Sequence, residues 1–318
     1  MNKGRKTLRF RPWALRLLAL GALAVVFRAC GSGPTSTRAP PQVTARATAI
    51  PPPQPSISSD ATVLVGAENC DTGLSDAARR NDESLRRLTF APFRRPETGW
   101  EVYEPLMAHE IGTRCGGSSS AFASDLAAWQ SAHGLEADGV VSAATFAALK
   151  AVWEARRPFV AANHAGCPAP PPEASLAVVP AVQSYGGKIL RLRPRALAAY
   201  EQMLASARAA APELRADPRL MTVFSAYRSP EYDAARCARD GNCQGVTRAS
   251  CSPHRTGLAM DIYLGAEPGY GPDSSDDANR LFITHGGAYR WMVENAGRFG
   301  FAPYAFEPWH WEWIGEPI

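Results

Sequence analysis

Residues 252–261 read SPHRTGLAMD, and residues 307–310 read EPWH. The first stretch places His254 at the end of a Gly-, Ser- and Cys-rich loop and Asp261 inside an apolar run that has strand composition. The second stretch opens into an alternation of tryptophan with polar residues over 309–313, which also predicts a strand. Histidine and carboxylate side chains are therefore expected on or beside two strands of one C-terminal segment.

These residue types suit a catalytic zinc site. Two imidazoles and one carboxylate, from His254, Asp261 and His310, leave a fourth position for water. Zinc lowers the pKa of that water and polarises a carbonyl, and a nearby carboxylate must then accept the proton and deliver it to the leaving amine. Glu307 is available for this task, because Pro308 interrupts the strand alternation before His310. A lone His or Asp on a strand is usually structural. The presence of both stretches, 252–261 and 307–310, in one segment favours a zinc site.

The surrounding segment predicts a mixed fold. Pro194 opens a helix whose apolar face is Leu197, Tyr200 and Leu204. Residues 221–225 and 258–264 have strand composition, and residues 289–296 read as a helix that ends at a glycine. Helices and strands do not alternate regularly, so the α+β class fits better than α/β.

Four blocks of this segment resemble one family. The S-x-H-x-x-G-x-A-x-D string of residues 252–261 and the E-P-W-H string of 307–310 look like those of the VanY-type D-alanyl-D-alanine carboxypeptidases. SAYR at 225–228 and WMVENAGRFGF at 291–301 resemble two further blocks of that family, in the right order. The resemblance covers most of residues 182–318 and implies an α+β zinc peptidase of the Hedgehog/DD-peptidase type.

The resemblance also implies residue roles. It places zinc on His254, Asp261 and His310, with Glu307 as the catalytic base. Arg228 is expected to bind the substrate carbonyl or stabilise the oxyanion, a role that suits a fixed cationic donor. Ser252 is expected to hydrogen-bond the substrate or a ligand, and a loop-capping role is the equal alternative. The stretch from Cys237 to Cys251 departs from the family pattern and could wall the substrate cleft.

A second resemblance covers an earlier helical stretch. Phe122, Leu126 and Trp129 recur at helical spacing, and Ser142 can cap a second helix after the turn at Asp138-Gly139. The string from Leu126 to Leu149 is similar to the peptidoglycan-binding-like three-helix domain. That likeness implies binding to the cell-wall polymer, although its apolar residues are expected to be core and to define the fold more than a binding surface.

Composition shifts divide the chain. Residues 1–30 combine basic residues with a short apolar run, which predicts an export signal or anchor. Residues 31–60 form a Pro/Ser/Thr-rich tether, 61–160 the helical domain, 161–181 a Pro-rich linker and 182–318 the peptidase domain. This division predicts that residues 182–318 alone hold the active site.

The N-terminal segment bears on localisation. The apolar run from Leu17 to Phe27 is too short to span a bilayer, and Ala29-Cys30 resembles a lipoprotein processing site at which Cys30 would carry the lipid. Simple cleavage and an uncleaved anchor are the alternatives. All three place the rest of the chain outside the cytoplasm, in the periplasm or cell envelope.

Six further cysteines follow Cys30, and an even number in an exported chain favours disulfides, with one bridge expected among the last three.

The formal net charge of +4 comes from the basic N-terminal segment, which leaves a slightly acidic remainder. A slightly acidic body argues against nucleic acid as a partner.

The sequence thus favours a zinc peptidase that removes a terminal D-amino acid from peptidoglycan stem peptides. An endopeptidase on the same fold, a non-catalytic wall-binding protein and a zinc-binding protein without catalysis are the alternatives. The intact set His254, Asp261, Glu307 and His310 argues against the non-catalytic readings, because binding alone has no need of a free base.

Overall fold

The computed structural model describes residues 69–241, 243 and 250–318. The predicted export signal, Cys30 and tether lie outside these residues. The described residues all belong to one compact unit. Within the described ranges, no helix is both long enough and apolar enough to cross a membrane.

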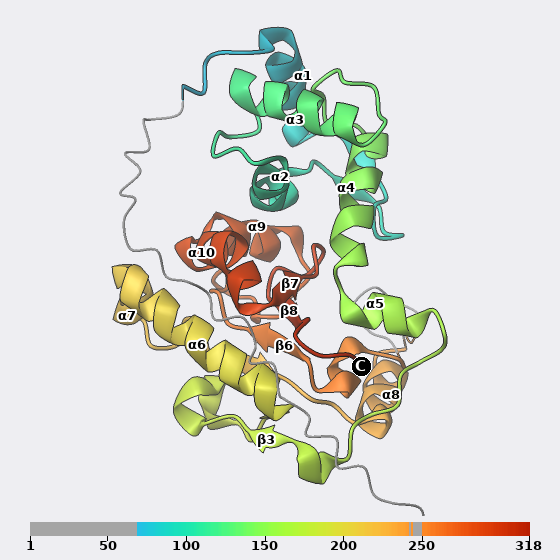
Figure 1. The fold of residues 1–318 in the computed structure, drawn as a ribbon, viewed down its shortest axis with the longest axis vertical. Coiled ribbons are helices and arrows are strands. Elements are labelled where there is room, and N and C mark those ends of the chain that lie inside the picture. The colour runs from blue at the N-terminus through green and yellow to red at the C-terminus, as the bar shows by residue number, and fades with distance from the viewer. Residues whose placement is uncertain (1–68, 242, 244–249) are drawn as a thin grey trace, which may run out of the picture. The chain divides into compact units, whose positions relative to one another are not determined.

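A four-stranded antiparallel sheet carries the C-terminal segment (Figure 1). Its strand order is β5-β6-β8-β7. The bounds are Val223–Ser225 for β5, Ala259–Ile262 for β6, Phe301–Pro303 for β7 and His310–Trp313 for β8. The three predicted strands are confirmed as β5, β6 and β8. The α+β class is confirmed as well, since the helices are not interleaved with parallel strands.

Five helices accompany this sheet: α6 (Pro194–Ala210), α7 (Pro212–Ala216), α8 (Pro230–Arg239), α9 (Asp277–His285) and α10 (Gly287–Asn295). The helix predicted to open at Pro194 is α6, and its apolar face of Leu197, Tyr200 and Leu204 is buried as expected. Proline fits that first position because its missing N–H would have no partner there. A short hairpin of β3 (Ala177–Val178) and β4 (Arg191–Leu192) precedes α6.

The earlier segment is helical and holds α1 (Ser75–Leu85), α2 (Glu104–Ile111), α3 (Ser120–Ala132), α4 (Ala143–Ala155) and α5 (Pro158–Asn163), with a hairpin of β1 (Thr89–Phe90) and β2 (Glu97–Thr98). Ser142 caps α4 as predicted, since its Oγ accepts from the Thr145 backbone N–H at 3.1 Å. Gln130 secures the preceding turn by accepting from the Gly139 N–H and donating to the Val140 carbonyl.

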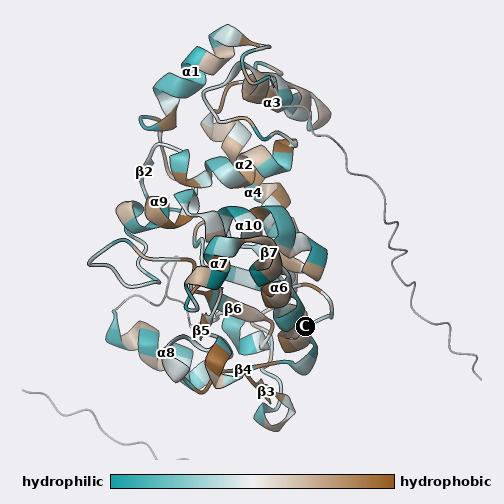
Figure 2. Cartoon of the chain, turned by 90° about the vertical axis from the view of Figure 1, so that its left-hand side faces the viewer, coloured by the Kyte–Doolittle hydropathy of each residue, from teal (hydrophilic) through white to brown (hydrophobic). Residues whose placement is uncertain are grey.

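One hydrophobic core runs through both segments. It includes Phe122 and Phe146 from the helical segment and Met260 and Trp311 from the sheet. Figures 1 and 2 show α2 directly beside α10, and residues of these two helices are in contact. The boundary predicted between 160 and 182 therefore separates two segments that share a core.

A buried arginine also joins the segments. Arg280 of α9 is fully buried and donates to Glu97 Oε2 at 3.1 Å, to the Tyr103 hydroxyl and to the Phe306 carbonyl at 3.0 Å. Glu97 and Tyr103 belong to the helical segment. The charge of each buried group is thus compensated by a partner in the other segment.

We expect Arg280→Met to lower the free energy of unfolding by about 3–5 kcal/mol, because the Glu97 carboxylate would stay buried without its cation. Urea denaturation of the variant and the wild type measures this. Arg79→Met is the matched control, since Arg79 pairs with Glu83 at the surface and exposed pairs contribute little. Equal stability of Arg280→Met and the wild type would contradict a joined core.

All six predicted disulfide cysteines are paired. The bridges are Cys70–Cys115, Cys167–Cys251 and Cys237–Cys243. The last confirms the bridge expected among the three late cysteines. Three disulfides indicate an oxidising compartment outside the cytoplasm.

Candidate metal centre and active site

The register of the sheet brings two predicted ligands together. Asp261 on β6 lies directly opposite His310 on β8. Residues opposite each other in an antiparallel pair project from the same face of the sheet, with their Cβ atoms about 5 Å apart. Pairing of the two strands is therefore enough to place this carboxylate beside this imidazole.

The third ligand comes from the turn that leads into β6. His254 lies in a 3₁₀ helix, η5 (Pro253–Thr256), which Ser252 caps by accepting from the His254 backbone N–H. Gly257 then takes a left-handed conformation with φ of 70°, which lets the chain turn sharply into the strand. His254 Nδ1 lies 2.7 Å from the Ala226 carbonyl, so Nδ1 donates and Nε2 keeps its lone pair for a metal.

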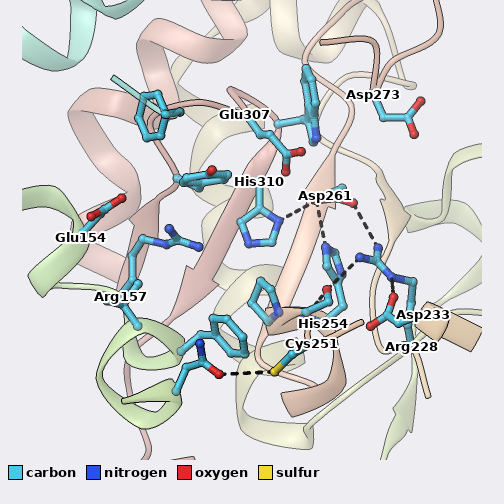
Figure 3. A pocket seen from close by; sticks show the side chains of 18 of the residues that line it. Glu154, Arg157, Arg228, Asp233, Cys251, His254, Asp261, Asp273, Glu307 and His310 are labelled. Carbon is cyan, nitrogen blue, oxygen red and sulfur yellow. Dashed lines mark hydrogen bonds and ion pairs between the residues drawn. The ribbon is translucent and has the colours of Figure 1, made fainter. Parts of the chain in front are cut away.

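The three donor atoms converge (Figure 3). Asp261 Oδ1 lies 3.2 Å from His254 Nε2 and 2.9 Å from His310 Nδ1, and all three ligand atoms lie within 4.8 Å of one another. The three residues are between 1% and 6% exposed. Two nitrogens and one carboxylate oxygen aimed at one buried point form a donor set that fits zinc and leaves room for a further ligand.

The pKa values in this cluster diverge. Burial, with help from the nearby Arg228 charge, lowers the pKa of His254 to about 4. Burial also acts to lower the pKa of His310, but hydrogen bonding and charge from Asp261 and Glu312 outweigh it and raise that pKa to about 9. Burial opposes ionisation of Asp261, yet the two histidines hold its pKa well below the usual range. The cluster therefore keeps Asp261 ionised and His254 unprotonated at neutral pH, which are the states that bind metal, whereas His310 must release its proton when metal binds.

Glu307 points into the same cavity as these ligands (Figure 3). No described residue forms a hydrogen bond or ion pair with its carboxylate. Removal from bulk water is the main cause that raises its pKa to about 7; the His310 charge opposes this rise and the Asp261 charge adds to it. A carboxylate with a pKa near neutrality can both accept and return a proton.

Arg228 also lines this cavity and is held by three side chains. Its guanidinium donates to Asp233 Oδ1 at 2.8 Å, Ser225 Oγ at 2.8 Å and Ser252 Oγ at 2.9 Å, and it lies 3.8 Å from Asp261 Oδ2. Ser252 thus caps the turn before His254 and anchors Arg228. The structure brings all six predicted site residues into one region.

The cavity has a volume of about 510 Å³, which suits a short peptide. Cys237 and Cys251 are the two ends of the stretch that departs from the family pattern. Both line the cavity, as expected of a stretch that walls the substrate cleft. Lys150, Arg157 and Phe159 of the helical segment line it as well. The expectation that residues 182–318 alone hold the site is therefore wrong for the cavity, because α4 and α5 supply part of its lining.

Sequence reasoning missed two residues next to the metal ligands. Glu312 lies two positions after His310 and therefore on the same face of β8, a signal that the strand alternation does contain. Arg157 pairs with Glu312 at 2.6 Å. Nothing in the sequence links Arg157 to a site more than 150 residues away.

The buried donor set, with the Glu307 carboxylate in the same cavity, suits a metal-dependent hydrolase. Residues 189–316 match the model of the VanY family, D-alanyl-D-alanine carboxypeptidase. Residues 189–316 are thus similar to the VanY-type D-alanyl-D-alanine carboxypeptidases, and they contain the buried His254, Asp261 and His310, whose donor atoms fit zinc.

Solved structures show partial similarity. VanYB in complex with D-alanine-D-alanine is 22% identical, with 46% of this chain and 82% of that chain covered and a TM-score of 0.28. A mutant of the vancomycin resistance D,D-pentapeptidase VanY from a VanB-type cassette, in complex with Zn(II), is also 22% identical. The match covers 46% of this chain and 83% of that chain, with a TM-score of 0.27. DacB from Streptococcus pneumoniae D39 is 20% identical, with 39% of this chain and 67% of that chain covered and a TM-score of 0.26. No curated protein matches the chain.

Proposed function

We propose that this protein uses zinc to remove the terminal D-alanine from peptidoglycan stem peptides. The observation that carries the proposal is the Glu307 carboxylate, which forms no hydrogen bond or ion pair with any described residue and shares one cavity with His254, Asp261 and His310. A zinc site built only for binding would have no need of such a group. The match of residues 189–316 to the VanY family supports the substrate class.

Each residue has a defined task in the proposed reaction. Zinc held by His254, Asp261 and His310 would polarise the scissile carbonyl and lower the pKa of water. Glu307 accepts the proton of the attacking water and passes it to the leaving amine of D-alanine. Arg228 donates to the carbonyl oxygen as negative charge develops there. Cationic side chains that line the cavity, among them Arg94 and Arg236, suit a peptide that ends in a carboxylate.

Arg228→Lys is expected to lower kcat by about 10²–10³-fold and to leave bound zinc unchanged. A lysine ammonium cannot keep the contacts to Asp233, Ser225 and Ser252 and still present a planar donor to the substrate. Steady-state kinetics on a D-alanyl-D-alanine peptide, with elemental analysis of the same sample, measures both quantities. An unchanged kcat would remove Arg228 from the mechanism.

Ser252 is proposed to act on the reaction by holding Arg228. Its Oγ accepts from the arginine and from the His254 N–H, which accounts for both of its hydroxyl lone pairs. Its hydroxyl proton could still be donated to the substrate, and direct substrate contact by Ser252 stays a prediction.

Digestion of defined muropeptides by the purified, zinc-loaded protein tests the activity, with products identified by mass. Loss of a single C-terminal alanine from pentapeptide stems supports the proposal. Cleavage within stems or crosslinks would instead establish an endopeptidase on the same fold. The absence of any product from zinc-loaded protein would leave a wall-binding role and overturn the proposed activity.

We also propose that the helical segment contacts the wall polymer and that the protein acts in the periplasm or cell envelope. The likeness of residues 126–149 to peptidoglycan-binding-like domains supports the first point, although Leu126, Phe146 and Leu149 are core. The three disulfides support the second. Pelleting of the protein with purified sacculi, with excess soluble stem peptide present to occupy the active site, tests wall binding.

A further inference from the structure

Arg157 reaches from the helical segment to the strand that carries His310. It lies between α4 and α5 and approaches Glu312 Oε1 with Nε at 2.8 Å and Nη2 at 2.6 Å. The backbone N–H of Phe159 donates to the other oxygen, Oε2, at 3.2 Å. The side chains of Arg157 and Glu312 are 8% and 2% exposed. Both carboxylate oxygens of Glu312 are therefore fixed by residues of the helical segment.

Glu312 in turn faces His310, on the ring nitrogen that points away from the metal position. His310 uses Nδ1 toward Asp261, and its other ring nitrogen, Nε2, lies 3.6 Å from Glu312 Oε1. That distance is longer than a hydrogen bond. Nε2 is buried without a hydrogen-bond partner among the described residues, and the carboxylate is the group that faces it. Glu312 therefore favours the ring orientation that turns Nε2–H toward itself and the Nδ1 lone pair toward the metal position.

A second contact acts on the same ring. The Arg157 guanidinium lies 4.1 Å from the centre of the Tyr304 ring, and Tyr304 packs edge-on against His310 with ring centroids 5.9 Å apart. Arg157 thus contacts two neighbours of His310, the Glu312 carboxylate and the Tyr304 ring (Figure 3 shows Arg157 beside His310).

We propose that Arg157 is a positioning residue of the metal centre, so that the helical segment is a working part of the catalytic unit. This inference rests on the proposed function in that it takes His310 as a zinc ligand. A histidine ligand whose second nitrogen faces a fixed carboxylate has a defined tautomer and ring angle, and loss of such support typically lowers metal affinity or activity about 10–100-fold. Here the group that fixes the carboxylate comes from outside the segment that matches the VanY family.

The test measures zinc affinity of the full chain by competition with a chromophoric chelator, together with urea denaturation. Arg157→Met, Glu312→Gln and the double variant are compared with the wild type. Arg156→Met is the matched control, because Arg156 is the neighbouring arginine and pairs with Glu110, and neither residue lines the cavity. The absorption spectrum of the cobalt-substituted proteins reports the ligand geometry independently of turnover.

We expect Arg157→Met to bind zinc about 10–100-fold more weakly and to lose stability, because the Glu312 charge stays buried without its partner. The double variant removes both charges and should regain stability while its zinc affinity stays low. Arg157→Lys should restore part of the affinity. Arg156→Met should match the wild type, and the cobalt spectrum should shift only in the Arg157 and Glu312 variants.

Wild-type zinc affinity and cobalt spectrum in the double variant would overturn the proposal, since Arg157 would then only neutralise a buried charge. If Arg157→Met alone does not fold, the double variant still decides the question. Failure of the proposed function looks different: a wild-type protein that binds zinc tightly but releases no D-alanine would disprove the peptidase activity and leave these affinity differences in place.

Discussion

Glu307→Gln is expected to keep a full complement of zinc and to lose about 10²–10⁴-fold in kcat. The amide is nearly the same size as the carboxylate, so the cavity and the ligands stay as they are. It cannot accept the proton of the attacking water, and it cannot return one to the leaving amine. Kinetics on a D-alanyl-D-alanine peptide and elemental analysis of one preparation separate the loss of chemistry from any loss of metal.

Glu294→Gln is the matched control, because this glutamate is exposed on α10 and the same change there should leave both measurements at wild-type values. Turnover of Glu307→Gln within a few-fold of the wild type would show that another group moves the proton. Loss of zinc from Glu307→Gln would show that Glu307 helps to hold the metal.

His310→Ala is expected to lower the zinc content well below one ion per molecule and to abolish turnover. The change removes one of three protein ligands from a buried site, and Asp261 then loses the imidazole 2.9 Å away that helps keep it ionised. Elemental analysis after dialysis against a weak chelator measures the effect. His109→Ala on α2 is the control, since His109 is an exposed histidine that the donor set does not include.

Full zinc occupancy and unchanged turnover in His310→Ala would show that the metal site lies elsewhere. Intermediate binding with lost turnover would still support the assignment, since two remaining ligands can retain metal weakly in a geometry that does not support the reaction.

Much of this architecture could be predicted because the local signals are strong. The alternating residues of 309–313 and the apolar run around Asp261 specify strands through side-chain period, and Ser142 and Pro194 mark helix starts through their own chemistry. The spacing of His254 and Asp261, together with Glu307 and His310 near the C-terminus, gave the ligand set. These signals depend only on neighbouring residues, so one sequence is enough to find them.

The parts that could not be predicted depend on contacts between distant residues. The strand order that sets Asp261 opposite His310 is a property of the folded sheet. The joined core of the two segments and the Arg157–Glu312 pair arise from packing of α4 and α5 near β8, which no local pattern encodes. The Pro-rich stretch after residue 166 looks like a spacer between independent units. In the structure, a disulfide from Cys167 to Cys251 fastens it next to the turn that carries His254.

The pairing of β6 with β8 makes metal binding a measure of folding fidelity. A slip of β8 by one residue would turn His310 and Glu312 to the opposite face and put Trp311 where the imidazole now stands. Such a molecule could keep much of its secondary structure, but it would lack a ligand and bind zinc poorly. Misregistered molecules would therefore be inactive and would not gain an altered specificity. The zinc content of a preparation then reports the fraction of molecules in which β6 and β8 pair in the native register.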